Sequence, residues 1–133
     1  MAVIEKIPTE TPSAEARVDA ALLDSLRLEL RRGCLVAAVL AQLGEEHYGY
    51  TLRKALADRG LAIEESTLYP LLRRLEAQGL LTSQWREEGK RNKRFYRLSR
   101  TGEAMLEQLL AEWRGLNASL ANIVGNRRNV EER

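Results

Sequence analysis

The chain has 133 residues, of which 44% are hydrophobic and 30% charged, and its formal net charge is +2. This length and composition indicate one globular domain with a modest core and exclude a disordered chain. No apolar run approaches the roughly 20 residues that span a bilayer, and residues 1–11 lack a basic-then-apolar signal pattern. We therefore expect a cytoplasmic protein with no membrane partner.

The charge is distributed unevenly along the chain. Residues 1–48 carry 5 basic and 8 acidic side chains, residues 49–102 carry 12 and 6, and residues 103–133 carry 4 and 5. A basic middle segment between mildly acidic flanks is typical of a nucleic-acid-binding face. A solvated basic face without a partner is the alternative.

The N-terminal half is predicted to be helical. Residues 1–12 are expected to form a flexible tail, followed by a helix over residues 13–30 that is capped by Ser13. Gly33 either breaks this helix or only weakens it before a strongly apolar helix over residues 33–43. The single cysteine, Cys34, is expected to be a small buried hydrophobic residue, with a redox sensor as the alternative.

The next segments predict a helix-turn-helix. A helix opens at Tyr48-Gly49-Tyr50 and ends at Gly60. A second helix starts near Glu65 or Ser66, because Pro70 fits best in a first turn, and it ends near Gly79. Its apolar positions follow the i, i+3, i+4, i+7 spacing of one helix face: Leu68, Leu71, Leu72 and Leu75.

After this helix the sequence period changes to that of strands. Residues 80–86 and 93–98 are predicted to pair as a β-hairpin around a polar turn over residues 87–92. A hairpin directly after a helix-turn-helix is a wing, and this one is basic: Arg86, Lys90, Arg91, Lys93 and Arg94. The alternative is a solvated hairpin whose cations discourage edge pairing.

The last helix, over residues 101–124 and capped by Ser99, has the 3-4-3-4-3 spacing of a coiled-coil seam. Its apolar positions are Leu106, Leu109, Trp113, Leu116, Leu120 and Ile123. A long apolar stripe placed after a complete small domain needs a partner surface, and a second copy of the chain is the expected one. Residues 125–133 are expected to form a flexible polar tail.

The polar face of the 66–75 helix carries the chemistry expected of a major-groove reader. Small hydroxyls at a helix N-terminus favour phosphate, and Tyr69 either reaches a phosphate or packs on the preceding helix. The predicted DNA-binding residues of helix and wing together are Ser66, Thr67, Tyr69, Arg73, Arg74, Lys90, Arg91, Lys93 and Arg94. An ordinary amphipathic helix with a solvated face is the alternative.

Catalysis is not expected. The chain has one histidine, His47, and no Cys/His cluster, glycine-rich phosphate loop or nucleophile elbow. The paired carboxylates Glu45-Glu46 and Glu87-Glu88 fall in predicted turns, where solvated charge is the simplest interpretation. We predict no catalytic residues, no metal site and no cofactor.

Several motifs in order make the chain resemble the PadR family of winged-helix transcriptional regulators over about residues 30–124. They are Arg31-Arg32-Gly33, Tyr48-Gly49-Tyr50, the run from Ser66-Thr67-Leu68-Tyr69-Pro70 to Glu76, Gly79-Leu80, Tyr96-Arg97-Leu98-Ser99 and Gly102. Two features depart from the family pattern. Ser66 stands where the family usually has glycine, and the helix over residues 13–30 lies outside the usual core; it either joins the dimer interface or covers the wing domain.

The resemblance implies a mainly α fold with a small β-hairpin: a winged helix-turn-helix over residues 31–100 and a long C-terminal dimerisation helix. It further implies a homodimer on a palindromic double-stranded DNA operator, acting as a repressor that a small-molecule effector relieves. Trp113 on the seam is the candidate contact for a hydrophobic or aromatic ligand, with plain interface packing as the alternative. The competing function is a winged-helix protein–protein interaction module without DNA binding.

Overall fold

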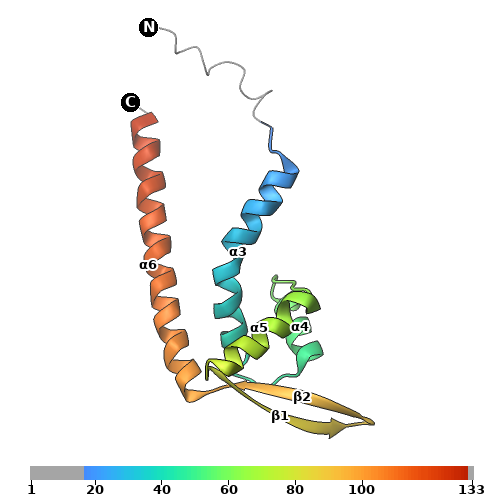
Figure 1. Cartoon of the computed structure of the whole chain (residues 1–133). Helices are drawn as coiled ribbons and strands as arrows, with labels where there is room; N and C mark the ends of the chain where they lie inside the picture. The colour runs from blue at the N-terminus through green and yellow to red at the C-terminus, as the bar shows by residue number, and fades with distance from the viewer. Residues whose placement is uncertain (1–16, 132–133) are drawn as a thin grey trace. The chain divides into compact units, whose positions relative to one another are not determined.

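The computed structural model describes residues 17–131 of the chain. Within that range the chain forms four helices and one hairpin, in the order α3 (Ala20–Gln42), α4 (Gly49–Asp58), α5 (Glu65–Ala77), β1 (Leu81–Glu88), β2 (Arg91–Leu98) and α6 (Arg100–Glu131) (Figure 1). The predicted fold class, mainly helical with a small hairpin, is confirmed. No described helix has the length and apolar character needed to cross a bilayer.

The two helices predicted before residue 44 are one helix, α3. It starts at Ala20, where the Asp19 carboxylate accepts a hydrogen bond from the Leu22 N–H at 3.1 Å, while the proposed Ser13 cap lies outside the described residues. The helix passes Gly33 without a break. A glycine in the middle of a helix lowers helix stability by only about 1 kcal/mol relative to alanine. The helix persists because the leucines and arginines beside Gly33 are good helix formers.

The chain divides into two compact units between Cys34 and Leu35, inside α3 rather than at the predicted boundary before residue 31. Cys34 is a free, half-buried thiol. The described part of the first unit is the stretch from residue 17 to 34. Its large apolar side chains are exposed: Val18, Leu22, Leu23, Leu26, Leu28 and Leu30.

The second unit contains the core. The leucine stripe of α5 is buried as its spacing predicted, with Leu71 partly covered. It packs with apolar side chains from the end of α3, from α4 and from the base of the hairpin. The buried core residues are Val39, Leu40, Leu43, Leu52, Leu56, Ile63, Leu68, Leu72, Leu75, Leu80, Leu81 and Tyr96.

The hairpin is longer, and its turn tighter, than the sequence suggested. β1 and β2 pair antiparallel from Leu81↔Leu98 to Glu88↔Arg91, so only Gly89 and Lys90 form the turn. Gly89 has φ +70°, a left-handed conformation that glycine adopts without strain. The prediction of a turn over residues 87–92 was wrong because polar side chains on a solvated hairpin resemble a loop.

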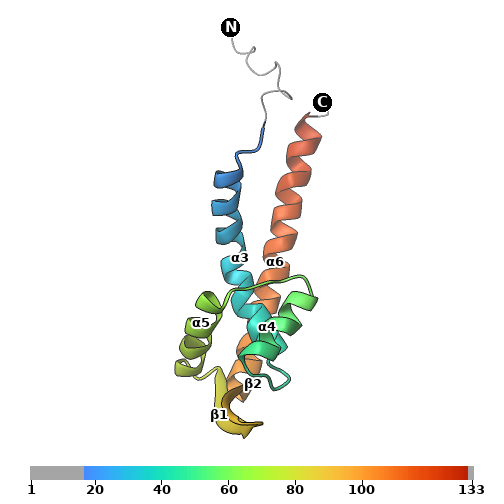
Figure 2. The same ribbon diagram turned by 90° about the vertical axis from the view of Figure 1, so that its right-hand side faces the viewer.

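Helix α6 begins as predicted, since the Ser99 hydroxyl accepts a hydrogen bond from the Gly102 N–H at 2.9 Å. Leu106 and Leu109 pack against the core of their own unit. The four remaining seam residues stay exposed: Trp113, Leu116, Leu120 and Ile123. The helix continues to Glu131 as one uninterrupted element, which corrects the predicted tail from residue 125 (Figure 2).

Candidate nucleic-acid interface

The side of α5 opposite the leucine stripe is open to solvent. Ser66, Thr67, Arg73 and Arg74 are all exposed. Helix α5 starts at Glu65, and its N-cap residue makes no side-chain capping hydrogen bond. The first turn also carries Glu65, and the Thr67 N–H already donates to the Glu64 carbonyl at 3.0 Å. The exposed Ser66 and Thr67 hydroxyls are the polar groups at this helix start that suit a phosphate oxygen.

Pro70 lies in the second turn of α5, not in the first turn where it was expected. It has no N–H to donate to the carbonyl oxygen of Ser66, four residues earlier. The helix tolerates this loss because Ser66 is exposed, so that water can satisfy its carbonyl.

Tyr69 packs on the first turn of α4. A Cβ atom added to Gly49 would overlap the ring and the hydroxyl of Tyr69, so glycine is needed for this close approach. The ring is half-buried rather than fully covered. The ring of Tyr69 therefore packs on the preceding helix, as one of the two sequence interpretations had it. The residue also keeps some solvent exposure beside the polar face of α5, which the other interpretation, a phosphate contact, requires.

The hairpin cations fall into two groups. Lys90 and Arg91 lie at the tip, are exposed and form no ion pair with any described residue. Lys93, in contrast, donates to Glu88 Oε1 at 3.1 Å and to the Tyr48 hydroxyl at 3.2 Å. These two hydrogen bonds raise the pKa of Lys93 above its usual 10.5, the one to Tyr48 contributing most. Among the predicted wing contacts, Lys90 and Arg91 are thus the two cations without a competing carboxylate in the described chain.

Arg94 joins the hairpin to α5. Its guanidinium donates to Glu76 Oε1 at 2.9 Å and to the Ser83 hydroxyl at 2.9 Å, and that hydroxyl donates to Glu76 Oε2 at 2.6 Å. The Arg94 Cζ atom also lies 5.5 Å from the centre of the Trp85 ring. A residue predicted to contact DNA is therefore engaged in bracing the wing against the helix.

Arg86 is similarly occupied. It forms an ion pair with Glu46, and its Cζ atom lies 3.9 Å above the Phe95 ring. The carboxylate of Glu46, predicted to be simply solvated, thus has a partner on the hairpin. Glu87 is exposed, as that prediction required.

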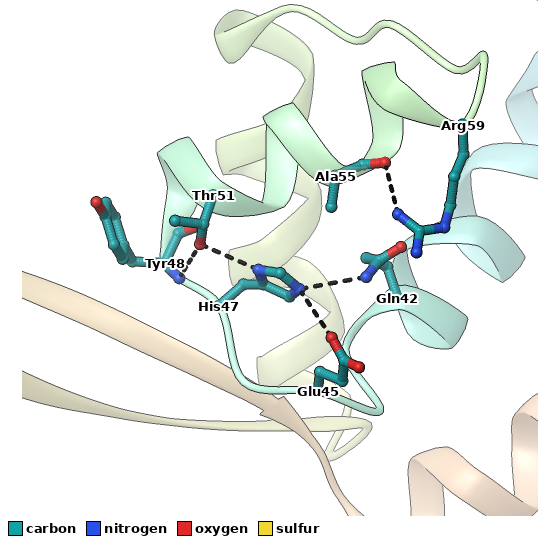
Figure 3. A network of polar contacts seen from close by, with 7 residues as sticks. All are labelled: Gln42, Glu45, His47, Tyr48, Thr51, Ala55 and Arg59. Carbon is teal, nitrogen blue, oxygen red and sulfur yellow. Dashed lines mark hydrogen bonds and ion pairs between the residues drawn. The ribbon is translucent and has the colours of Figure 1, made fainter.

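The loop before α4 is fixed by His47 (Figure 3). Its backbone pairs with Tyr96 on β2, through N–H to O distances of 3.1 and 2.8 Å. Its ring nitrogens contact Thr51 Oγ1 at 3.0 Å and Gln42 Nε2 at 3.2 Å. The Thr51 hydroxyl donates to the Tyr48 carbonyl, so it accepts from His47 Nδ1, and Nε2 accepts from Gln42. This network holds the start of α4 against the hairpin.

Between the start of α4, α5 and the hairpin is an open hollow of about 380 Å³, which we call the helix–wing hollow. Three of the side chains that line it are cationic: Arg73, Lys93 and Arg94. The remaining side chains that line it are aromatic: Tyr48, Tyr69, Trp85 and Tyr96. Burial raises the pKa of Tyr96, while Arg94 and Arg73 lower it and Glu76 raises it, which places the phenol within the field of these charges.

Four residues of the hollow were absent from the predicted site: Tyr48, Gly49, Trp85 and Tyr96. A usable signal was the alternation of side chains along strands. Trp85 pairs with Arg94 and Ser83 with Tyr96, so these four share one face of the hairpin. Across residues 17–131 there is no group of three or more His, Cys, Asp or Glu side chains arranged to hold a metal ion.

Comparison with known proteins fits this geometry. The family model described as the transcriptional regulator PadR-like family matches residues 38–108, which is more than half of the chain. The chain belongs to the PadR family.

Solved PadR structures share its fold. A PadR family transcriptional regulator from Eggerthella lenta is 46% identical with a TM-score of 0.75, and the match covers 79% of this chain and 94% of that one. A PadR-like transcription factor from Bacteroides fragilis is 32% identical with a TM-score of 0.64, over 74% and 98% of the two chains. A transcriptional regulator of Mycobacterium tuberculosis is 41% identical over 63 residues, covering 47% of this chain and 59% of that protein.

The family assignment settles the general activity. The chain is a DNA-binding transcriptional regulator, and the prediction that it is a regulator rather than an enzyme is confirmed by these relatives. The winged-helix fold is likewise confirmed.

Proposed function

We propose that this PadR regulator is a homodimeric repressor that reads a palindromic operator with α5 and grips the neighbouring backbone with its wing. The observation that carries the proposal is the exposed polar face of α5. Ser66 and Arg73 lie opposite the buried leucine stripe, and Thr67 and Arg74 lie on its flank. The hydroxyls are at the helix start and the guanidiniums one to two turns later. This order suits phosphate contacts at the helix N-terminus and base-edge or phosphate contacts from the arginines.

The exposed face also weighs against the alternative of a protein-interaction module that buries it. Tyr69 is the intermediate case, since its ring packs on Gly49 but is only half covered. We assign it to the DNA-binding face through its hydroxyl. The helix face and the wing tip together then form one basic surface.

The wing contacts are assigned mainly to its tip. Lys90 and Arg91 are exposed and without carboxylate partners in the described chain, so binding a phosphate costs them no existing ion pair. Lys93 and Arg94 hold Glu88 and Glu76 respectively. We propose that these two act at the DNA surface chiefly by keeping the hairpin and its partner residues in place.

The dimer is proposed to form through the distal half of α6. Trp113, Leu116, Leu120 and Ile123 are between 40% and 65% exposed. Complete burial of one such side chain is worth about 1.5–3 kcal/mol, so covering the exposed halves of four would contribute roughly 3–6 kcal/mol per protomer. A second copy is the natural cover, because soluble oligomers are mostly symmetric homo-oligomers.

We propose that the first unit adds to this interface. Leu22, Leu26 and Leu30 follow the i, i+4, i+8 spacing on α3 and are all more than half exposed. Leu106 and Leu109, predicted for the seam, contribute mainly by packing α6 onto its own core.

Repression would follow if the dimer occupies a promoter. Relief by a small aromatic or hydrophobic effector is proposed to act at Trp113, whose indole is 40% exposed on the apolar side of α6. A flat ligand stacked there would bury additional ring surface between protomers. Titration of aromatic compounds against the emission of a Trp85→Phe variant, which retains only Trp113, tests this part.

The salt dependence of duplex binding tests the DNA contacts. If a dimer neutralises six to ten phosphates, affinity should fall roughly 10³- to 10⁵-fold between 50 and 200 mM salt. The double variant Lys90→Ala/Arg91→Ala should flatten the log–log slope by about 0.9 per lost phosphate contact, or about 3.6 for a dimer. Arg59→Ala removes an exposed cation at the far end of α4 from Tyr48 and is the matched control (Figure 3). An unchanged slope in the double variant would remove the tip from the proposed interface.

A further inference from the structure

The helix–wing hollow carries one uncompensated positive charge. Of its three cations, Lys93 is paired with Glu88 and Arg94 with Glu76. Arg73 is exposed and has no carboxylate partner in the described part of the chain. A hollow with a single free guanidinium suits a ligand with a single negative charge.

The hollow also contains hydroxyl groups without acceptors. Tyr96 is 5% exposed, yet its hydroxyl makes no hydrogen bond with any residue that the structure describes. The Tyr69 hydroxyl, above Gly49, has no such partner either. Glu76, whose charge acts on Tyr96, already accepts from Arg94 and Ser83. A nearly buried phenol without a partner calls for an acceptor from outside the chain.

One wall of the hollow is an exposed aromatic ring. Trp85 is 62% exposed although it lies on a paired strand, and the Arg94 guanidinium is 5.5 Å from its ring centre. Such a ring presents a flat apolar surface to anything that enters beside it. The ligand should therefore combine an anionic, acceptor-only part with an adjoining apolar part.

A DNA backbone has this combination at every nucleotide, since each phosphodiester carries one negative charge and adjoins a deoxyribose. We propose that the helix–wing hollow receives one backbone phosphate of the bound duplex, held by Arg73 and the hydroxyls of Tyr69 and Tyr96. The deoxyribose next to that phosphate packs on Trp85. The inference rests on the proposed function and adds to it a defined phosphate pocket in which Trp85 and Tyr96 are binding residues.

The position of the hollow supports a duplex phosphate over a free anion. Arg73 belongs both to the exposed face of α5 and to the hollow, so a strand that follows α5 passes the opening. The hollow is also open rather than enclosed, which a phosphate within a continuous backbone requires. A free phosphate dianion would exceed the single uncompensated charge.

The test replaces phosphates of a selected duplex one at a time with neutral methylphosphonate. With the wild-type protein, several positions per half-site should weaken binding, and one of them, the phosphate in the hollow, should cost roughly 10- to 100-fold in affinity, the scale of hydrogen bonds to a charged group. With the Arg73→Ala protein, the same methylphosphonate replacement should cost less than about 3-fold, because the phosphate charge that it removes no longer has Arg73 as a partner. Arg59→Ala, the control, should keep the wild-type pattern.

Tyr96→Phe tests the buried hydroxyl. It keeps the ring and the core volume, and we expect weaker binding of the unmodified duplex with the log–log salt slope unchanged, because the lost donor is neutral. Urea unfolding of Tyr96→Phe shows whether its fold is intact. Arg73→Ala changes an exposed residue and therefore tests the hollow independently of the core. Trp85→Ala should weaken binding and Trp85→Phe should largely restore it.

Three outcomes would overturn the inference. If wild type binds the duplex with a steep salt slope but the methylphosphonate pattern is the same in Arg73→Ala, the hollow is not a phosphate pocket and the proposed function survives. If inorganic phosphate perturbs Trp85 emission in a Trp113→Phe background while Arg73→Ala leaves duplex affinity unchanged, the hollow serves a free anion. If wild type binds no duplex at any salt concentration, both the proposed function and this inference fail.

Discussion

Replacing Arg94 with alanine should mainly lower the stability of the domain rather than remove a direct contact with DNA. The side chain joins β2 to α5 through Glu76 and to β1 through Ser83, and it lies beside the Trp85 and Tyr96 rings. An arginine whose role was to bind phosphate would be expected to have an unoccupied guanidinium. Arg94 has two short hydrogen bonds within its own chain.

The magnitude follows from these contacts. A hydrogen bond to a charged group contributes about 1.5–3 kcal/mol net, and a guanidinium over an aromatic ring about 0.5–1 kcal/mol at an exposed site. The Arg94 and Glu76 side chains are 35% and 26% exposed, so solvent weakens the pair. We expect Arg94→Ala to lower the free energy of unfolding by about 1.5–3 kcal/mol, a Tm shift on the order of 10 °C.

The assay is urea unfolding of four proteins: wild type, Arg94→Ala, Glu76→Gln and the double variant. The cycle should give a coupling energy of at least about 1 kcal/mol between the two sites. Arg91→Ala, at the exposed hairpin tip, is the control and should change stability by less than about 0.5 kcal/mol. If Arg94→Ala unfolds like wild type but loses DNA affinity, the bracing role is wrong and Arg94 contacts DNA directly.

Three further predictions concern packing, assembly and pH. Gly49→Ala should cost about 1–3 kcal/mol because its Cβ would overlap a tyrosine ring of α5, whereas Gly33→Ala, with nothing within 4 Å, should be neutral or stabilising in thermal unfolding. Leu120→Glu should convert the dimer to a monomer in sedimentation equilibrium; a persistent dimer would exclude the distal α6 interface. Hydrogen bonds to Tyr48 and Glu88 raise the pKa of Lys93 in the folded protein. The stability that these hydrogen bonds contribute is fully present below pH 10.5, the usual lysine pKa, and is lost as the pH rises through the pKa of folded Lys93. In urea unfolding, the Tyr48→Phe variant should therefore lose less stability above that pH than wild type does. An equal loss in the variant and in wild type would contradict the assignment.

Patterns within single elements predicted the fold well. The four leucines at helical spacing fixed the buried side of α5, and the start of α6 followed from Ser99 alone. These features depend on neighbours within one or two turns, which the sequence displays directly. The bounds of the hairpin were less accessible, because Glu87 and Asn92 face each other on solvated strands and carry no apolar alternation.

The contacts between side chains within the candidate site could not be predicted from the sequence. Charge and position placed Arg94 on the wing, but its partner Glu76 lies 18 residues earlier on another element. Local sequence does not reveal which carboxylate a cation will meet after folding. The same holds for Tyr96, whose burial beside Arg73 arises only when the hairpin docks on α5.

Helix continuity was only partly predictable from local rules. Gly33 was expected either to break its helix or only to weaken it, and a tail was predicted from Gly125, yet α3 and α6 continue through both glycines. Glycine ends a helix chiefly when it adopts a left-handed conformation after the last turn, as Gly79 does with φ +81° after α5. In mid-helix it only lowers stability, and the surrounding residues decide the outcome.

Selection of bound sites from a random duplex pool tests the central claim most directly. A dimer that places two α5 helices in successive major grooves should enrich a palindrome whose half-sites are about 10–10.5 base pairs apart, or a multiple of that spacing. The enriched motif should lose its symmetry or its affinity when Leu120→Glu protein is used. Recovery of no motif, or of a single asymmetric half-site by the wild-type protein, would contradict the account.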